Sequence, residues 1–254
     1  MKSLFDVTGE VVVITGSTRG IGFSLAKGFL EAGARVIING RSDASVKKAV
    51  EKLTNEGFDV NGYAFDVMDQ ESVSQNINNI EKKIGAISVL INNAGIHRRA
   101  PFTEMTLNDW QAVIDTNLNS AFIVAKEVSR YMIPRKYGRI INTTSLNSEA
   151  ARPSLANYCA AKGGLKMFTK SLAVELGQYN ILTNAIGPGY FSTDLTKPLQ
   201  EDPEFDQWVK SEVPLKRWGR PEELIGAAIF LASDAASYIN GHTIYVDGGW
   251  QAGL

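Results

Sequence analysis

Residues 15–22 read TGSTRGIG and directly follow the apolar run Val11–Ile14. A buried strand that enters a glycine-rich turn and continues as a helix gathers unpaired backbone N–H groups at the positive end of the helix dipole, a geometry that binds phosphate. Gly16 permits the tight turn, Gly20 lets the backbone approach a pyrophosphate, and Gly22 lets the helix pack close to the strand. The motif alone is a weak signal, because a surface turn with incidental glycines has the same letters.

Short apolar runs alternate with segments of helical periodicity along the chain. The clearest helix pattern places Val73, Ile77, Ile80 and Ile84 on one face and stops at Gly85, a residue typical of helix ends. This alternation predicts an α/β fold: one parallel sheet with helices on both faces, joined by right-handed crossovers. We expect a single domain over all 254 residues, since no linker, repeat or low-complexity tract interrupts the pattern. Strands are predicted over residues 11–15, 35–39, 62–67, 87–91, 139–144, 181–186 and 243–246.

The segment from about residue 188 to 220 departs from this alternation. Five of the eight prolines lie between Pro188 and Pro221, together with Tyr190 and two tryptophans. A second domain would need more residues and a core of its own. We therefore predict a mobile lid over a site at the carboxyl ends of the strands.

Composition excludes several classes of function. With 26 basic and 27 acidic residues and no basic stripe, neither nucleic acid nor an anionic membrane is an expected partner. Cys159 is the only cysteine, and the two histidines lie far apart without acidic neighbours at ligand spacing, so we expect no metal site. The first residues lack the apolar core of a signal peptide, and no apolar run is long enough to span a bilayer. We expect a soluble, cytoplasmic protein.

Four polar residues form a candidate catalytic group. Tyr158 and Lys162 stand four apart in a helix-forming stretch and therefore share one face. Ser145 follows a predicted strand, at the edge where open α/β sheets bind ligands. Asn117 lies in the long helix predicted before that strand.

These four residues make chemical sense together. A phenol with a pKa of about 10 is a poor base at neutral pH. The Lys162 ammonium, like an oxidised nicotinamide, would stabilise the Tyr158 phenolate and lower that pKa. Ser145 can donate a hydrogen bond to a substrate oxygen, and Lys162 can also reach a ribose hydroxyl. Asn117 can hold a water that links Lys162 to solvent. A nicotinamide would supply the hydride.

The choice of nicotinamide depends on the end of the second strand. A site that prefers NAD places an acidic residue there to bind the ribose hydroxyls. This chain has Asn39, Gly40 and Arg41 instead, and Arg19 lies in the glycine-rich loop. Two guanidinium groups at that point suit the 2′-phosphate of NADP(H), with NAD as the alternative. Solvated surface arginines are the other interpretation of Arg19 and Arg41.

The chain as a whole resembles a known family. The motifs that carry the resemblance occur in the family's order and spacing over essentially the whole chain. The family is that of the short-chain dehydrogenases/reductases, which implies a seven-stranded Rossmann sheet, a nicotinamide cofactor, an Asn-Ser-Tyr-Lys tetrad and usually a homotetramer. The motifs are TGSTRGIG, Asn92-Asn93-Ala94-Gly95, Asn117, Ser145, Tyr158 with Lys162, and Pro188-Gly189.

The resemblance also implies positions for the cofactor. Asn93 and Gly95 would line the adenosine ribose and the sheet centre, and Asp66 would contact the adenine. Phe191 and Thr193 would meet the carboxamide and phosphate end. The predicted cofactor-binding residues are Gly16, Ser17, Arg19, Gly20, Ile21, Gly22, Arg41, Asp66, Val67, Asn93, Ala94, Gly95, Tyr158, Lys162, Pro188, Gly189, Phe191 and Thr193.

Residues 94–102 and 217–228 look like those of gluconate 5-dehydrogenases, which interconvert D-gluconate and 5-keto-D-gluconate. A sugar acid offers a carboxylate that an arginine can hold in a fork, and Arg98, Arg99 and Arg152 are the candidates. Solvated loop arginines are the alternative interpretation of each. Ser145, Asn147 and Tyr158 complete the predicted substrate residues.

Other features of the sequence fit alternative substrates or functions. Asn147 stands where the gluconate enzymes have glutamine, and residues 246–250 look more like 2-deoxy-D-gluconate 3-dehydrogenases. A 3-oxoacyl-carrier-protein reductase would have the same tetrad, although it needs a basic patch for its acidic carrier. A cofactor-binding regulator without catalysis is disfavoured by the intact tetrad.

Overall fold

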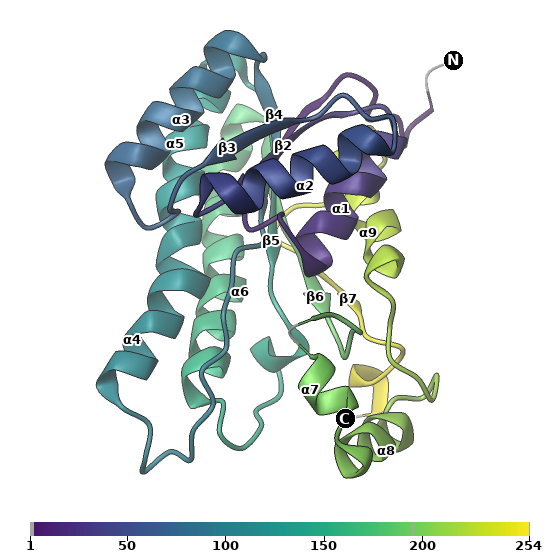
Figure 1. The fold of residues 1–254 in the computed structure, drawn as a ribbon. Helices are drawn as coiled ribbons and strands as arrows, with labels where there is room; N and C mark the ends of the chain where they lie inside the picture. Colours follow the sequence, from purple (N-terminus) through teal and green to yellow (C-terminus); the bar gives the residue numbers. More distant parts are fainter. Residues whose placement is uncertain (1–2, 195, 254) are drawn as a thin grey trace.

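The computed structural model describes residues 3–194 and 196–253. Its seven strands form one parallel sheet in the order β3-β2-β1-β4-β5-β6-β7, with helices on both faces (Figure 1). The predicted α/β class and the seven-stranded Rossmann sheet are thereby confirmed. The strands are β1 (Val11–Ile14), β2 (Arg35–Gly40), β3 (Asn61–Ala64), β4 (Ile87–Asn92), β5 (Gly138–Thr143), β6 (Ile181–Pro188) and β7 (Thr243–Val246).

Two hydrophobic cores lie on opposite faces of the sheet because side chains alternate along each strand. Val12 and Ile14 pack with α1, α2 and α9, whereas Val11 and Val13 pack with α3, α5 and α6. No helix of the described residues is both long and apolar enough to cross a membrane. The α-helices are α1 (Gly20–Glu31), α2 (Asp43–Asn55), α3 (Gln70–Lys83), α4 (Leu107–Ile114), α5 (Ser120–Arg135), α6 (Ala156–Leu176), α7 (Lys197–Gln200), α8 (Pro203–Glu212) and α9 (Ile225–Ala232).

The strand order places the site. From β1 the chain winds outward through β2 to β3, then returns to the other side of β1 and continues from β4 to β7. The crossovers after β1 and β4 therefore leave the sheet in opposite directions, and a crevice opens at the carboxyl ends of these two strands. Residues 15–22 and 93–99 follow those two ends.

The third strand differs from its prediction over residues 62–67. It ends at Ala64, although the Phe65 N–H still donates to the Gly40 carbonyl of β2 at 3.0 Å. Asp66 then accepts the Met68 N–H at 2.9 Å, a local side-chain turn that leads the chain towards α3. The α3 helix itself matches its pattern: Val73, Ile77 and Ile80 are buried, and Gly85 follows its end with φ +140°.

The segment expected to form a lid contains two helices, α7 and α8, beyond the ends of β6 and β7 (Figure 1). β6 continues two residues past its predicted end, so Pro188 still belongs to the sheet. Residue 195 of the segment lies outside the described residues. Tyr190 packs edge-on against Phe205, Trp208 and Trp218, in a cluster that also contains Leu146 and Trp250 from outside the segment, so the segment packs on the rest of the domain.

Candidate active site

The glycine-rich turn joins β1 to α1 in the conformation that the sequence predicts. Gly16 has φ +63° and Gly20 φ +57°, backbone conformations that favour glycine. A Cβ on Gly22 would lie 2.5 Å from the Asn93 side chain, so only glycine fits this close approach. No side chain caps α1, and its first N–H groups, which include that of Ile21, therefore remain available to an anion.

Several inward hydrogen bonds brace this turn. The Ser17 hydroxyl donates to the Ile14 carbonyl at 2.7 Å and accepts the Asn39 N–H at 3.0 Å. The Asn93 side chain donates to the Thr15 and Gly16 carbonyls at 3.0 and 3.2 Å. The Asn93 amide thus holds the turn, whereas the resemblance implied that Asn93 lines the adenosine ribose.

The other residues of the β4 end are also tied to the turn. The N–H groups of Asn93 and Ala94 donate to the Thr15 hydroxyl at 2.9 and 3.1 Å. A Cβ on Gly95 would lie 3.2 Å from the Asn117 side chain. The strand end and the glycine-rich turn therefore form one rigid floor for the crevice.

Of the two predicted phosphate arginines, Arg41 follows the carboxyl end of β2 and Arg19 lies in the glycine-rich turn directly before α1. Arg19 and Arg41 are exposed, and within the described part of the chain neither side chain has a hydrogen bond or ion pair. Gly40 is the last residue of β2, and a Cβ there would come within 2.6 Å of the methyl group of Thr18, the residue before Arg19. The Thr18 methyl group therefore leaves no room for an acidic side chain at the end of β2. Asp66 is exposed and Val67 buried, both just beyond β3.

Three of the four predicted catalytic residues lie together at the end of β5. Ser145 follows the strand and hydrogen-bonds the Tyr158 side chain, which α6 presents from the neighbouring face. The Lys162 Nζ donates to the Thr143 carbonyl at 2.6 Å and is almost fully buried. The tyrosine, serine and lysine that the sequence grouped by spacing are thus close in space.

Asn117 lies in a π-helical turn, Asp115–Asn119, between α4 and α5. The long regular helix expected there is therefore interrupted, as is common at functional sites. Its side chain accepts the Ile96 N–H at 2.7 Å and donates to the Ile96 carbonyl at 2.9 Å. Asn117 thereby fixes the loop that follows β4, a contact that its position in the sequence did not indicate.

Burial controls the protonation of the tyrosine and the lysine. It raises the pKa of Tyr158 to about 12, although the hydrogen bond from Ser145 and the charge of Arg99 act in the opposite direction. It lowers the pKa of Lys162 to about 8. The expectation that Lys162 lowers the Tyr158 pKa is not met in this structure, because desolvation of the phenol is the largest effect. Tyr158 is therefore a protonated phenol at neutral pH.

The candidate substrate arginines have different surroundings. Arg98 pairs with Asp109 at 3.0 Å, so its guanidinium is already occupied. Burial lowers the pKa of Arg99, with Tyr190, Arg152 and Tyr158 as charged or polar neighbours. Arg99 is an exposed residue whose charge is near enough to interact with Tyr158, whereas Arg98 is paired with Asp109 of α4.

Arg152 is held by the aromatic side chains of the 188–220 segment. Its guanidinium lies 3.7 Å above the Trp208 ring and donates to the Tyr190 hydroxyl at 2.8 Å. A stacked guanidinium keeps most of its donors in its own plane. Asn147 lies deeper: its N–H donates to the Ser145 hydroxyl at 3.1 Å and its amide to the Ala150 carbonyl at 2.9 Å.

The remaining predicted cofactor residues follow β6. Gly189 packs against Asp247, where a Cβ would lie 2.7 Å from the Asp247 Cα atom. Phe191 is buried and bridges to Gly219, and Thr193 exchanges hydrogen bonds with Thr196. The segment after Pro188 thus returns towards the start of α1.

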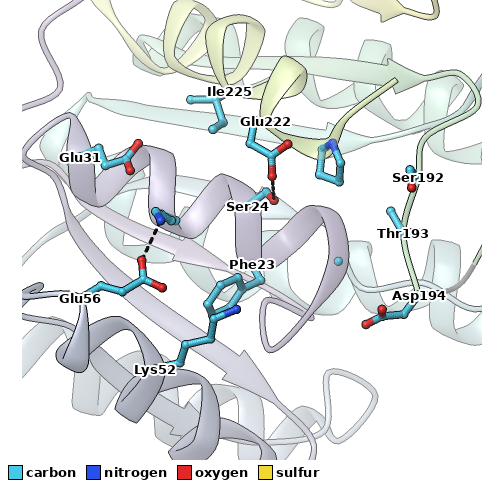
Figure 2. A pocket seen from close by; sticks show the side chains of 13 residues that line it. Phe23, Ser24, Glu31, Lys52, Glu56, Ser192, Thr193, Asp194, Glu222 and Ile225 are labelled. Atoms are coloured by element: carbon cyan, nitrogen blue, oxygen red, sulfur yellow. Dashed lines mark hydrogen bonds and ion pairs between the residues drawn. The ribbon is translucent and has the colours of Figure 1, made fainter. Parts of the chain in front are cut away.

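A pocket of about 470 Å³ lies on the outer side of α1 (Figure 2). It runs from Gly20 and Thr193 past the Ser24–Glu222 hydrogen bond, and Lys27 pairs with Glu56 at 2.7 Å on its wall. None of the predicted catalytic residues lines it. The pocket therefore adjoins the phosphate end of the predicted cofactor site and is separate from Tyr158.

His97 is the residue of this region that the sequence reasoning missed. The sequence argued only against a metal-binding role for it, whereas in the structure its ring stacks on that of Tyr158 with centroids 4.0 Å apart. Its position two residues after Asn92-Asn93-Ala94-Gly95, at the carboxyl end of β4, was the available signal. Among the described residues, no group of three or more His, Cys, Asp or Glu side chains is placed to hold a metal ion.

Comparison with known proteins places this geometry in a family. A family model described as enoyl-(acyl carrier protein) reductase matches residues 16–251. The chain belongs to the short-chain dehydrogenase/reductase family. It is an oxidoreductase of the kind that acts on CH–OH groups, and the resemblance found in its motifs is confirmed.

Three members of this short-chain dehydrogenase/reductase family show what the chain is similar to. A 5-keto-D-gluconate 5-reductase of Escherichia coli is 46% identical, with 98% of each chain covered. A 2-dehydro-3-deoxy-D-gluconate 5-dehydrogenase of Formosa agariphila is 45% identical, over 97% of this chain and 94% of that protein. The crystal structure of a gluconate 5-dehydrogenase from Burkholderia cenocepacia, in complex with NADP and tartrate, has 43% identity, 98% coverage of both chains and a TM-score of 0.95.

Proposed function

We propose that this protein is an NADP-dependent oxidoreductase that interconverts D-gluconate and 5-keto-D-gluconate. The observation that carries the proposal is the grouping of Ser145, Tyr158 and Lys162 at the end of β5, with the charge of Arg99 near enough to act on Tyr158. The similarity to the Escherichia coli 5-keto-D-gluconate 5-reductase supports the choice of sugar acid.

The residues at the end of β2 fit NADP. Arg19 and Arg41 are exposed and, within the described ranges, uncommitted, so both can contact a 2′-phosphate. The crowding at Gly40 disfavours the carboxylate that an NAD site would place there. The uncapped start of α1 would hold the pyrophosphate. The relative from Burkholderia cenocepacia was solved with NADP.

The predicted catalytic residues would act as follows. Tyr158, protonated at neutral pH, donates its proton to the carbonyl oxygen as the ketone is reduced. Ser145 donates a hydrogen bond to the same oxygen, and Lys162 holds the ribose. NADPH, when bound, supplies the hydride. Asn117 positions the loop that follows β4, and we also expect it to hold a water that links Lys162 to solvent.

Two arginines would hold the carboxylate of the sugar acid. The charge of Arg99 is near enough to interact with Tyr158, and Arg152 is fixed by Tyr190 and Trp208, so the Arg152 side chain needs little further ordering when the substrate binds. Arg98 takes no part, since Asp109 already neutralises it. Because Arg152 is stacked on Trp208 of α8, carboxylate binding would also stabilise the proposed lid.

A second candidate substrate is 2-dehydro-3-deoxy-D-gluconate. The similarity to the Formosa agariphila enzyme favours it almost as strongly, and the arginines would hold its carboxylate equally well. The alternative considered from the sequence, a 2-deoxy-D-gluconate 3-dehydrogenase, acts on a different carbon. The two 5-dehydrogenase substrates share the reacting carbon and differ at the second carbon, which is a ketone in one of them, and at the third.

We also infer that the protein works in the cytoplasm as a homotetramer and as one domain with a lid. Helices α5 and α6 leave Phe122, Met167 and Val174 exposed, which favours burial against a further copy of the chain. Analytical ultracentrifugation at micromolar concentration tests this, and a monomer would contradict it.

A substrate panel tests the proposed function. NADPH oxidation is followed with 5-keto-D-gluconate, 2-keto-D-gluconate and an acetoacetyl thioester, and NADP⁺ reduction with D-gluconate and 2-dehydro-3-deoxy-D-gluconate. We expect the highest kcat/KM among the ketones for 5-keto-D-gluconate. A preference for the thioester would indicate an acyl-carrier reductase instead. Tight NADPH binding without any turnover would indicate a regulator.

A further inference from the structure

His97 is held in place from both sides. Its neighbour Ile96 is fixed by the two hydrogen bonds with the Asn117 amide. On the other side, the Asn157 amide donates to the Arg98 carbonyl at 3.0 Å, and Asn157 is fully buried. These contacts lay the imidazole on the Tyr158 ring at an interplanar angle of 24°. The backbone on both sides of His97 is therefore fixed.

The His97 imidazole is neutral at physiological pH. Burial lowers its pKa to about 4, and the positive charges of Arg99 and Lys162 act in the same direction. The titratable groups that face it are these two cations and the Tyr158 phenol. A neutral imidazole has one nitrogen that donates a hydrogen bond and one that accepts it.

One nitrogen of this ring lacks a hydrogen-bond partner. Nδ1 is buried and finds none among the residues that the structure describes, and no hydrogen bond of Nε2 is found among them either. Buried polar groups without partners are rare in folded proteins, and each calls for an explanation. A structural histidine would satisfy its nitrogens within the fold. This one lies against the proposed proton donor with its hydrogen-bonding capacity unused.

We propose that His97 is a specificity-determining residue that hydrogen-bonds the hydroxyl on the carbon next to the reacting carbon of the sugar acid. The inference rests on the proposed function. The reacting oxygen must lie at the Tyr158 hydroxyl, and the stacked ring lies one ring thickness away, within reach of the adjoining carbon. A substrate hydroxyl can donate to Nε2 or accept from it, depending on which nitrogen of the neutral ring carries the proton; Nδ1 itself is buried.

The neutral state of the ring suits this role. An imidazolium would be repelled by Arg99 and would add a third cation beside Tyr158. It would also offer only donors, whereas a neutral ring can pair with a hydroxyl in either sense. A substrate without that hydroxyl, such as an acyl chain, would leave the imidazole unpaired, and such a site rejects it.

Two variants separate recognition from packing. His97→Phe keeps a flat ring on Tyr158 and removes both nitrogens. His97→Gln restores a donor and an acceptor without the ring. Each is assayed with 5-keto-D-gluconate and with its 4-deoxy and 6-deoxy analogues, which lack one hydroxyl beside the reacting carbon. The Kd of NADPH is measured by fluorescence titration in parallel.

We expect the wild type to prefer 5-keto-D-gluconate over one deoxy analogue by about 10-fold or more in kcat/KM. The phenylalanine variant should lose that preference, mainly through a higher KM for the full substrate, and the glutamine variant should recover part of it. The NADPH Kd should not change. An equal loss on all three substrates would show that His97 only supports Tyr158 and would overturn the inference.

The wild-type data separate this proposal from the proposed function. Suppose that the wild type reduces 5-keto-D-gluconate and that His97→Phe keeps the same preference for it over the deoxy analogues. Only the role of His97 is then overturned. If the wild type reduces none of the three ketones, the proposed function fails and takes this inference with it.

Discussion

The Nζ atom of Lys162 donates to the backbone carbonyl of Thr143 at 2.6 Å, inside the sheet end and 4% exposed. One hydrogen bond does not replace the hydration shell that an ammonium has in water, so the charged form is disfavoured and its pKa falls to about 8. Burying the protonated Lys162 side chain, which is proposed to orient the ribose, therefore lowers the free energy of unfolding.

This cost predicts a pH dependence of folding. The unfolded lysine keeps its proton up to pH about 10.5, whereas the folded one releases it near 8, so the unfolded state binds more protons between these values. The free energy of unfolding should therefore rise with pH in that window, by about 2–3 kcal/mol from Lys162. Urea unfolding of the wild type and Lys162→Met between pH 7 and 10.5 measures it. A constant difference between the two proteins across that window would contradict the prediction.

Tyr158→Phe tests the proton donor. Removing the hydroxyl leaves the ring on His97 and the surrounding packing intact, but no proton can be transferred to the carbonyl oxygen. We expect kcat to fall by about 10²–10⁴-fold, with the NADPH Kd unchanged. Tyr131→Phe, on α5, is the matched control, since its hydroxyl contacts only Asn78 among the described residues. Retained turnover in the Tyr158 variant would remove it from the mechanism.

Substitutions at the proposed cofactor site should either weaken NADPH binding or introduce activity with NADH. Arg19→Ala with Arg41→Ala should raise the KM for NADPH by about 10-fold or more and leave that for NADH nearly unchanged, since a charge-assisted bond contributes about 1.5–3 kcal/mol. Gly40→Asp should gain NADH activity only with Thr18→Ser, which removes the methyl group 2.6 Å from the added Cβ. An unchanged NADPH/NADH ratio in the arginine variant would place the 2′-phosphate elsewhere. Arg130→Ala on α5 is the control for an exposed arginine.

The sequence was sufficient for the sheet and for the residues whose neighbours are local. Strand periodicity predicted all seven strands, and the four-residue spacing placed Tyr158 and Lys162 on one helix face. It was insufficient where a contact depends on tertiary packing. The π turn at Asn117, the stacking of His97 on Tyr158 and the aromatic support of Arg152 all join segments that are distant in the chain. Desolvation of Tyr158 is likewise a property of the folded site and reversed the expected direction of its pKa.

The last prediction concerns the carboxylate of the substrate and separates three arginines that the sequence could not rank. Arg99→Ala and Arg152→Ala should each raise the KM for 5-keto-D-gluconate by about 10-fold or more and have little effect on an uncharged keto-polyol, because each removes a charge-assisted hydrogen bond. Arg98→Ala should leave both KM values nearly unchanged, since its partner is Asp109. Steady-state kinetics on the two substrates gives the comparison.

The Arg152 variant should differ from the Arg99 variant in one further respect. Arg152 also joins α8 through Trp208 and Tyr190, so its loss should loosen the 188–220 segment in addition to weakening the carboxylate site. Hydrogen exchange of α8 amides should therefore accelerate in Arg152→Ala and stay unchanged in Arg99→Ala. Equal exchange in both variants would mean that the aromatic rings hold the segment without the guanidinium. A larger KM effect from Arg98 than from either of the others would exclude the proposed carboxylate site.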